Sequence, residues 1–133
     1  MNFGTVKLKM IDVEDIKTHE NDYELNTGSP HFVKFVDHVQ DYDVYKNGHQ
    51  IRNSDTFKKE GINVNFVEKT DADKIFVRTY ERGVEDETFS CGTGVTACAL
   101  VVMQQNNLHK VEVKVLGGNL KVYAEKSEKG FQN

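Results

Sequence analysis

Alternation of apolar and polar side chains marks several strands along the chain. Five segments share this period of two: residues 6–10, 24–26, 31–36, 62–68 and 74–81. Pro30, the only proline, follows Gly28 and Ser29 in a turn that leads into the third segment. The pattern predicts a protein in which strands dominate.

Two segments have the spacing of helices. Residues 95–103 are apolar on almost every side and are interrupted only by Thr96. This predicts a helix that begins at Thr93, ends near Asn106 and is buried on most sides. A weaker apolar spacing over residues 43–53 predicts a short helix on the surface.

A β-hairpin is predicted after the longer helix. Residues 111–115 and 120–124 alternate on either side of a turn at residues 117–119. The last residues, 127–133, are polar, so no final strand is expected there. We therefore expect one α+β domain over residues 1–133, with mostly antiparallel strands curled about a helix.

Composition and charge narrow the class of protein. A chain of 133 residues with 38% hydrophobic side chains can bury one core of ordinary size. Its formal net charge of -4 would repel a phosphate backbone, so no nucleic-acid partner is expected. The first ten residues lack the continuous apolar run of a secretory signal or membrane span, which predicts a cytoplasmic protein without a membrane partner. The five histidines are scattered, so no metal site is predicted.

The strongest local signal for chemistry is the sequence Cys91-Gly92-Thr93-Gly94 at the start of the buried helix. Exposed N–H groups and the helix dipole favour an anion there, and the same dipole favours a thiolate. Cys91 is therefore a candidate nucleophile or base. The alternative is a small buried cysteine beside glycines that only permit tight packing.

Other candidate residues carry weaker signals. Glu81 and Arg82 stand at a strand end shortly before the cysteine, where a solvated charged pair is the ordinary alternative. Ser29 and His31 flank the proline, and Asn63 begins a strand, so each of these has an ordinary structural interpretation as well. The acidic residues 85–87 are interpreted as solvated and receive no role.

Four motifs together resemble a known family: NTGSPH, GINVNF, YERG and SCGTGVTACA, in this order and at these separations. They are similar to the second half of the diaminopimelate epimerase family. The resemblance implies a β-rich barrel around a central helix and an isomerase that uses no cofactor. It also implies interconversion of LL- and meso-diaminopimelate, a small amino-acid substrate of lysine and peptidoglycan biosynthesis.

The resemblance implies a mechanism with two thiols on opposite faces of the substrate, one removing and one donating a proton. Cys91 resembles one of these acid/base groups, and Glu81 resembles the carboxylate paired with it. His31 resembles the imidazole that serves the cysteine of the other half.

The resemblance also implies substrate-binding residues. Arg82 and Asn63 resemble the groups that hold the substrate carboxylate and amine. Gly92 and Thr93 resemble backbone donors at the helix terminus. Ser29 stands where the family commonly has Asn, so a substrate hydrogen bond there is expected to be altered or made through water.

The amino-terminal half of such an enzyme is not in this sequence, so we expect a truncated carboxy-terminal half that is inactive alone. Its exposed cleft wall predicts self-association as a homodimer. Two alternatives remain open. One is a thiol hydrolase or transferase that uses Cys91 with His31 and Asn63. The other is a non-catalytic module that binds carboxylates.

Overall fold

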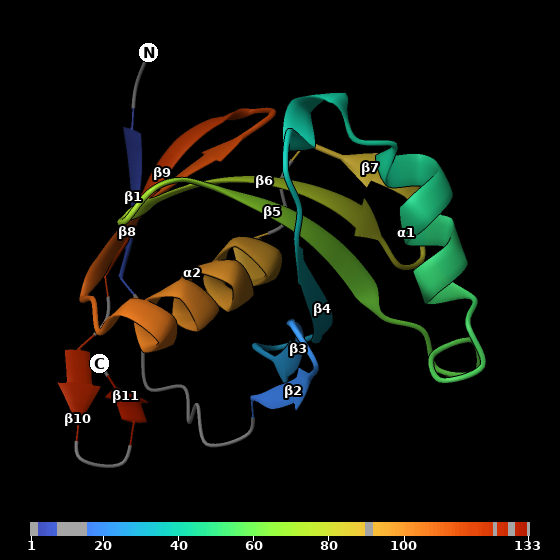
Figure 1. Ribbon diagram of the computed structural model, residues 1–133, viewed down its shortest axis with the longest axis horizontal. Coiled ribbons are helices and arrows are strands. Elements are labelled where there is room, and N and C mark those ends of the chain that lie inside the picture. Colours follow the sequence, from blue (N-terminus) through green and yellow to red (C-terminus); the bar gives the residue numbers. More distant parts are fainter. Residues whose placement is uncertain (1–2, 8–15, 90–91, 124, 128–129, 133) are drawn as a thin grey trace.

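The computed structural model describes residues 3–7, 16–89, 92–123, 125–127 and 130–132 (Figure 1). The strands are β1 (Phe3–Lys7), β2 (Lys17–His19), β3 (Asp22–Asn26), β4 (Pro30–Phe35), β5 (Asn63–Asp71), β6 (Lys74–Glu81), β7 (Asp86–Thr88), β8 (Lys110–Val115), β9 (Gly118–Tyr123), β10 (Glu125–Ser127) and β11 (Gly130–Gln132). The helices are η2 (Val39–Asp41, a 3-10 helix), α1 (Val44–Arg52) and α2 (Gly92–Asn106).

Nine of the described strands form one sheet, in the order β1-β9-β8-β6-β5-β4-β3-β2, with β7 paired to β6 beside this path. Three neighbouring pairs are parallel: β1 with β9, β4 with β5, and β6 with β8. The remaining pairs of this sheet are antiparallel. The strands β10 and β11 form a separate antiparallel pair.

The α+β class is confirmed, and five of the eight strand pairs in the large sheet are antiparallel, but the expected closed barrel is wrong. The sheet is mixed, and among the described residues its edge strands β1 and β2 do not pair to close it. Parallel pairs arise because helices lie in two of the connections, α1 between β4 and β5 and α2 between β6 and β8. Such a crossover returns the chain in the same direction as the strand it left.

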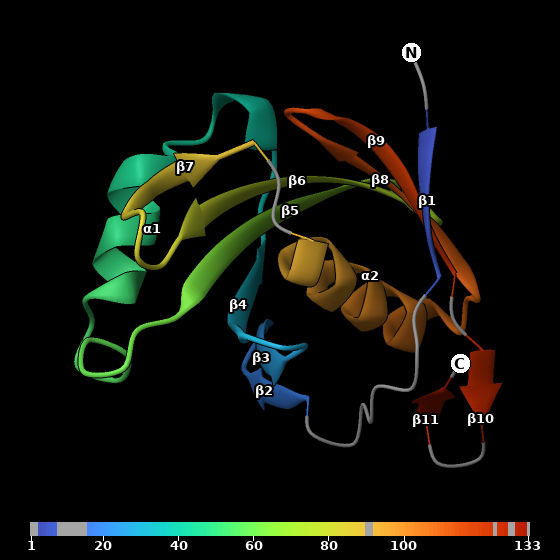
Figure 2. The same ribbon diagram turned by 180° about the vertical axis from the view of Figure 1, so that it is seen from behind.

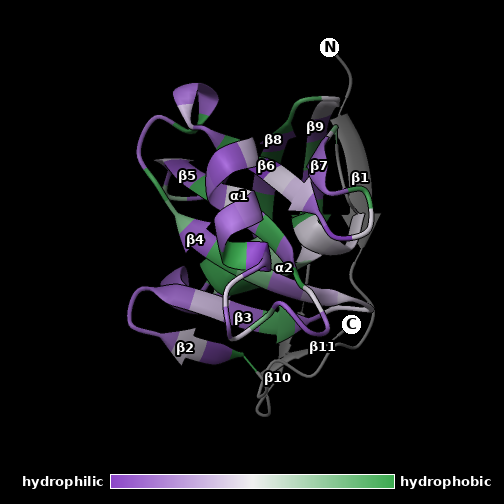
Figure 3. Ribbon diagram, turned by 90° about the vertical axis from the view of Figure 1, so that its right-hand side faces the viewer, coloured by the Kyte–Doolittle hydropathy of each residue, from purple (hydrophilic) through white to green (hydrophobic). Residues whose placement is uncertain are grey.

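The two long helices lie on opposite faces of the sheet. The sheet curves over α2, which packs against β3, β4, β5, β6 and β8 (Figures 1 and 2). Residues 94–103 of α2 are buried, as the apolar pattern predicts. The helix α1 covers β5, β6 and β7 on the other face and has a hydrophilic outer surface (Figure 3).

Most predicted elements are confirmed to within a few residues, including both helices, β3 to β6 and the β8–β9 hairpin. Val6 lies in β1, whereas Leu8 and Met10 lie outside the described residues. The expectation of no strand near the carboxyl end is wrong, because β10 and β11 pair there. The short strand β7 was also missed, since three polar residues carry no apolar alternation.

The position of α1 depends on two local features. Asp43 caps the helix, with its carboxylate accepting a hydrogen bond from the backbone N–H of Lys46 at 3.0 Å. Gly48 is buried against the ring of Tyr80 on β6, where even a methyl group would clash. Among the described residues, no helix combines the length and apolar content needed to cross a membrane.

Candidate active site

The sheet face that covers α2 changes from apolar to polar at one end. Along β4, β5 and β6, the side chains of Val33, Val67 and Val77 join the core around α2. Strand alternation puts His31, Asn63, Asn65 and Thr79 on the same face, nearer the amino end of α2, and all four are at most 4% exposed. A buried polar layer therefore faces the start of the helix.

His31 is the centre of this layer and is wholly buried. Its Nδ1 lies 3.0 Å from Asn65 Nδ2, and its Nε2 lies 2.8 Å from Thr93 Oγ1 and 3.1 Å from Ser29 Oγ. Burial, and next the charge of Arg82, lower the pKa of His31 from 6.5 to about 4. The imidazole is therefore neutral at physiological pH.

The β3–β4 turn is tied to the start of α2. The Thr27 hydroxyl donates to the backbone carbonyl of Thr93 at 2.7 Å, and the Ser29 and Thr93 hydroxyls are 3.0 Å apart. Gly28 has φ +115, which a side chain rarely adopts, and a Cβ there would lie 3.5 Å from Thr93 Cγ2. The turn thus fixes where the helix begins relative to the sheet.

Asn63 joins three strands through its side-chain amide. Its Nδ2 donates to the carbonyl of Pro30 at 3.0 Å and lies 3.4 Å from Ser29 Oγ, while its Oδ1 accepts from the backbone N–H of Arg82 at 2.8 Å. These bonds fix the position of the Arg82 backbone at the end of β6. In this structure the Asn63 amide is thus engaged by the protein itself.

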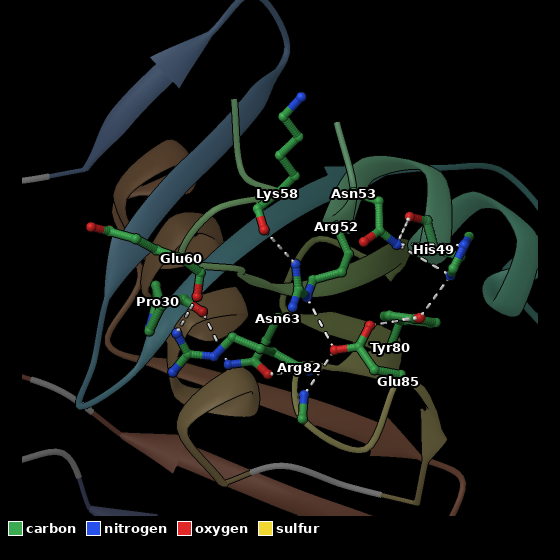
Figure 4. Close-up of polar contacts among 11 residues, drawn as sticks. Pro30, His49, Arg52, Asn53, Lys58, Glu60, Asn63, Tyr80, Arg82 and Glu85 are labelled. Atoms are coloured by element: carbon green, nitrogen blue, oxygen red, sulfur yellow. Dashed lines mark hydrogen bonds and ion pairs between the residues drawn. The ribbon is translucent and has the colours of Figure 1, made fainter. Parts of the chain in front are cut away.

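Arg82 is half-buried, and its guanidinium donates to the carbonyl of Glu60 at 3.0 Å (Figure 4). It lies across Gly61 from Arg52, which is paired with Glu85 at 3.1 Å. The Arg82 side chain and the Arg52 guanidinium therefore flank Gly61, and the Glu85 carboxylate offsets the charge of Arg52. The charge of Arg82 acts on His31 and helps to lower the pKa of its imidazole.

Glu85 also holds the turn that carries Arg82. It accepts hydrogen bonds from the backbone N–H of Gly83 at 2.9 Å and from the Tyr80 hydroxyl at 3.1 Å (Figure 4). The first of these is the largest cause that lowers the pKa of Glu85. The interpretation of residues 85–87 as merely solvated is therefore wrong for Glu85 and Glu87, whereas Asp86 is exposed as expected. Glu87 likewise pairs with Arg78 through two hydrogen bonds of 2.6 and 2.7 Å.

Two further predicted residues, Glu81 and Gly92, belong to the polar end of the domain. Glu81 is half-buried, and strand alternation puts it on the Thr79 face of β6. Gly92 is the exposed first residue of α2. Cys91, the central candidate, lies outside the described residues. Cys98 is buried within α2.

The structure thus brings Ser29, His31, Asn63 and Thr93 into direct contact, with Arg82 attached through its backbone. Three contributors were not predicted from the sequence: Thr27, Asn65 and Thr79. Asn65 could have been found from the sequence, because it stands on the same strand face as Asn63 among apolar neighbours.

No group of three or more candidate metal ligands occurs in the part of the chain that the structure describes.

A surface cavity of about 430 Å³ lies elsewhere, toward the carboxyl end of α2, and includes Tyr23, Phe35 and Gln105 in its lining. None of the candidate site residues that the structure describes lines it. The polar layer and this cavity are therefore separate features of the fold.

The family model and two related proteins that match this chain carry the same name. The family described as "Diaminopimelate epimerase" matches residues 23–132. Diaminopimelate epimerase of Flavobacterium psychrophilum is 43% identical over 130 residues, which are 96% of this chain and 51% of that protein. The enzyme of the same name from Aquifex aeolicus is 51% identical over 69% of this chain and 33% of its own length. The chain thus spans about half the first relative and a third of the second.

Two solved structures share the fold. A predicted epimerase from Pseudomonas aeruginosa aligns with a TM-score of 0.59 at 13% identity, covering 79% of this chain and 36% of that one. A PhzF-family phenazine biosynthesis protein from Bacillus anthracis aligns with a TM-score of 0.56 at 17% identity, over 87% of this chain and 36% of that one. At these identities the likeness concerns the fold alone.

Proposed function

The chain belongs to the diaminopimelate epimerase family, and we propose that it supplies one half of the active site of a cofactor-independent amino-acid epimerase. The observation that carries this proposal is the 43% identity to a diaminopimelate epimerase over 96% of the chain. The substrate we propose is diaminopimelate, interconverted between its LL and meso forms in the cytoplasm as a step of lysine and peptidoglycan biosynthesis.

The second half of the site would come from an amino-terminal half, which corresponds to the part of the relatives that this chain does not cover. Inverting a stereocentre requires a base on one face of the α-carbon and an acid on the other. In our proposal Cys91 is one of these groups, and a thiol of the amino-terminal half is the other. The chain alone is then expected to be inactive, whether monomeric or self-associated.

The described residues suit the binding of an α-carboxylate. The charge of Arg82 acts on His31, and the backbone N–H groups of Gly92 and Thr93 begin α2, where the Thr93 hydroxyl contacts the same ring. In our proposal these donors hold the carboxylate and stabilise the charge that develops when the α-proton leaves. Ser29 completes the binding surface, and Asn63, whose amide is engaged within the protein, is proposed to act through Ser29 and Arg82.

Glu81 and His31 would act beside the two thiols. The half-buried carboxylate of Glu81 is proposed to pair with Cys91 and favour proton transfer. His31 is proposed to serve the other half, and its Nε2 already contacts the Ser29 and Thr93 hydroxyls. Its influence on the opposite thiol would therefore pass through those hydroxyls.

The hydrolase alternative receives less support from this geometry. A thiol hydrolase needs a basic imidazole within reach of the cysteine. His31 instead has both ring nitrogens engaged and a pKa lowered to about 4, so it is a poor base near neutral pH.

A chimera tests the proposed function. In it, this chain replaces the matching part of the Flavobacterium psychrophilum enzyme, and conversion of LL- to meso-diaminopimelate is measured. We expect activity in the chimera, its loss in Cys91→Ser, and its retention in the matched control Cys98→Ser, which alters a buried thiol away from the polar layer. A folded but inactive chimera, or an active Cys91→Ser variant, would contradict the proposal.

A further inference from the structure

The side-chain amide of Asn65 has its orientation fixed from two sides. Its Nδ2 lies 3.1 Å from the backbone carbonyl oxygen of Phe32, which can only accept a hydrogen bond. Its Oδ1 lies 2.8 Å from the Thr79 hydroxyl, which donates to it. Turning the amide over would place two acceptors against each other at the Phe32 carbonyl. The NH2 group therefore faces Phe32 and, with its second hydrogen, His31.

This orientation determines which nitrogen of His31 carries the proton. Nδ1 lies 3.0 Å from the Asn65 NH2 group, so Nδ1 must accept a hydrogen bond and carry no hydrogen. A neutral imidazole then has its hydrogen on Nε2. We propose that Asn65 is a positioning residue that holds His31 as the neutral tautomer protonated on Nε2.

The surroundings of the ring support a neutral state as well. His31 is wholly buried, and Arg82 is the charged group that acts on it, with the same sign as an imidazolium. A second proton, on Nδ1, would also have to displace the hydrogen bond from Asn65. Both effects disfavour the doubly protonated ring.

The tautomer controls the hydrogens of the Ser29–Thr93 hydroxyl pair. One hydroxyl hydrogen serves the 3.0 Å contact between the two oxygens, which leaves one hydrogen for another acceptor. When His31 Nε2 donates, it takes up none of the hydroxyl hydrogens of the pair. The opposite tautomer would make Nε2 an acceptor and take up one of them. Asn65 thereby determines whether His31 competes with a third group for these hydrogens.

In the epimerase, that third group would be anionic, such as the substrate carboxylate or the opposite thiolate. This last step rests on the proposed function. The tautomer itself does not, because it is a property of the folded chain without substrate. A test on the ring nitrogens is therefore independent of any measurement of activity.

The experiment is long-range ¹H–¹⁵N correlation NMR of the 133-residue chain with ¹⁵N-labelled histidine at neutral pH. The two ring nitrogens of a neutral imidazole differ widely in shift, and their couplings to the ring protons identify the protonated one. We expect His31 to show a single tautomer with the hydrogen on Nε2. A ring protonated on Nδ1, or an even mixture of the two tautomers, would overturn the proposal.

The substitution Asn65→Asp tests the cause. A carboxylate beside Nδ1 can only accept, so we expect the hydrogen to move to Nδ1 and the nitrogen shifts to exchange places. The matched control is Asn53→Asp, the same change at an exposed asparagine 3.2 Å from His49 Nδ1, which should leave His31 unchanged. If Asn65→Asp does not fold, Asn65→Ala tests the same point without a new charge and should give a mixture of tautomers. A wild-type pattern in a folded Asn65 variant would overturn the proposal.

Discussion

The hydroxyl of Thr93 lies 2.8 Å from Nε2 of His31 and joins the first turn of α2 to a strand 62 residues earlier in the chain. The backbone carbonyl of Thr93 accepts a second bond, from the hydroxyl of Thr27. One residue thus links the buried helix to the polar end of the sheet. The candidate site depends on this link, because it sets the position of the helix terminus relative to His31.

Thr93→Val should weaken this link while keeping the shape of the side chain. The His31 N–H would keep only the longer contact to Ser29, so we expect a loss of about 1 to 3 kcal/mol in the free energy of unfolding. Denaturant unfolding measures it. Thr96→Val is the matched control, since the Thr96 hydroxyl bonds within α2 to the Gly92 carbonyl. Equal losses in the two variants would contradict a special role for Thr93.

The stability of the chain should depend on pH through His31. Its pKa is lowered from 6.5 to about 4 in the folded state, so the unfolded chain binds the proton first as pH falls. The neutral imidazole therefore contributes fully above pH 6.5, and this contribution declines by about 3 kcal/mol as pH falls to about 4.

Unfolding of wild type and His31→Gln across this pH range tests the effect. The variant lacks the group, so the difference in unfolding free energy between the two proteins should shrink as the pH falls from 6.5 toward 4. Curves that stay parallel would show that His31 does not titrate as described.

Gly48→Ala tests the packing of α1 on the sheet. Alanine should favour a helix by about 1 kcal/mol, but its Cβ would lie 2.6 Å from Cγ of the buried Tyr80 ring. Overpacking of this kind typically costs about 1 to 3 kcal/mol. We therefore expect a net loss in the free energy of unfolding. Thermal unfolding measures the sign. Gln50→Ala, at an exposed position of the same helix, should show no such loss, and a stabilised Gly48→Ala variant would refute the close contact.

Glu85→Gln should change the ionisation of Tyr80. Burial, and next the hydrogen bond and charge of Glu85, raise the pKa of Tyr80 to about 12. Removing the charge should lower this pKa, while burial keeps it above the ordinary value. NMR titration with ¹³C-labelled tyrosine measures the shift. Glu112→Gln, which removes a carboxylate paired with Lys74, is the control, and an unchanged Tyr80 in Glu85→Gln would rule out the contact.

The sequence predicted the elements of this fold better than their arrangement. Alternation located β4, β5 and β6, and the all-round apolar pattern located α2. The parallel pairings were not predictable from a period of two, because both parallel and antiparallel strands show it. Two of the three parallel pairs in the mixed sheet follow from the crossovers through α1 and α2.

In the candidate site too, single residues were predicted better than the contacts between them. Ser29, His31, Asn63 and Thr93 were singled out individually, and the structure brings them together. The partners that orient them were not found, because Asn65 acts on His31 across two strands and 34 residues. Contacts of this kind depend on strand pairing, which local sequence does not specify.

The central claim is that this chain contributes one of two acid/base groups to an epimerase. Its most direct test is conversion of LL-diaminopimelate in heavy water, with the chain alone and with the chimera, followed by NMR at the α-carbon during early turnover. The account predicts deuterium in the newly formed meso product of the chimera, hydrogen retained in the remaining substrate, and no exchange by the chain alone. Exchange by the chain alone, or equal labelling of substrate and product from the start, would contradict the two-group account.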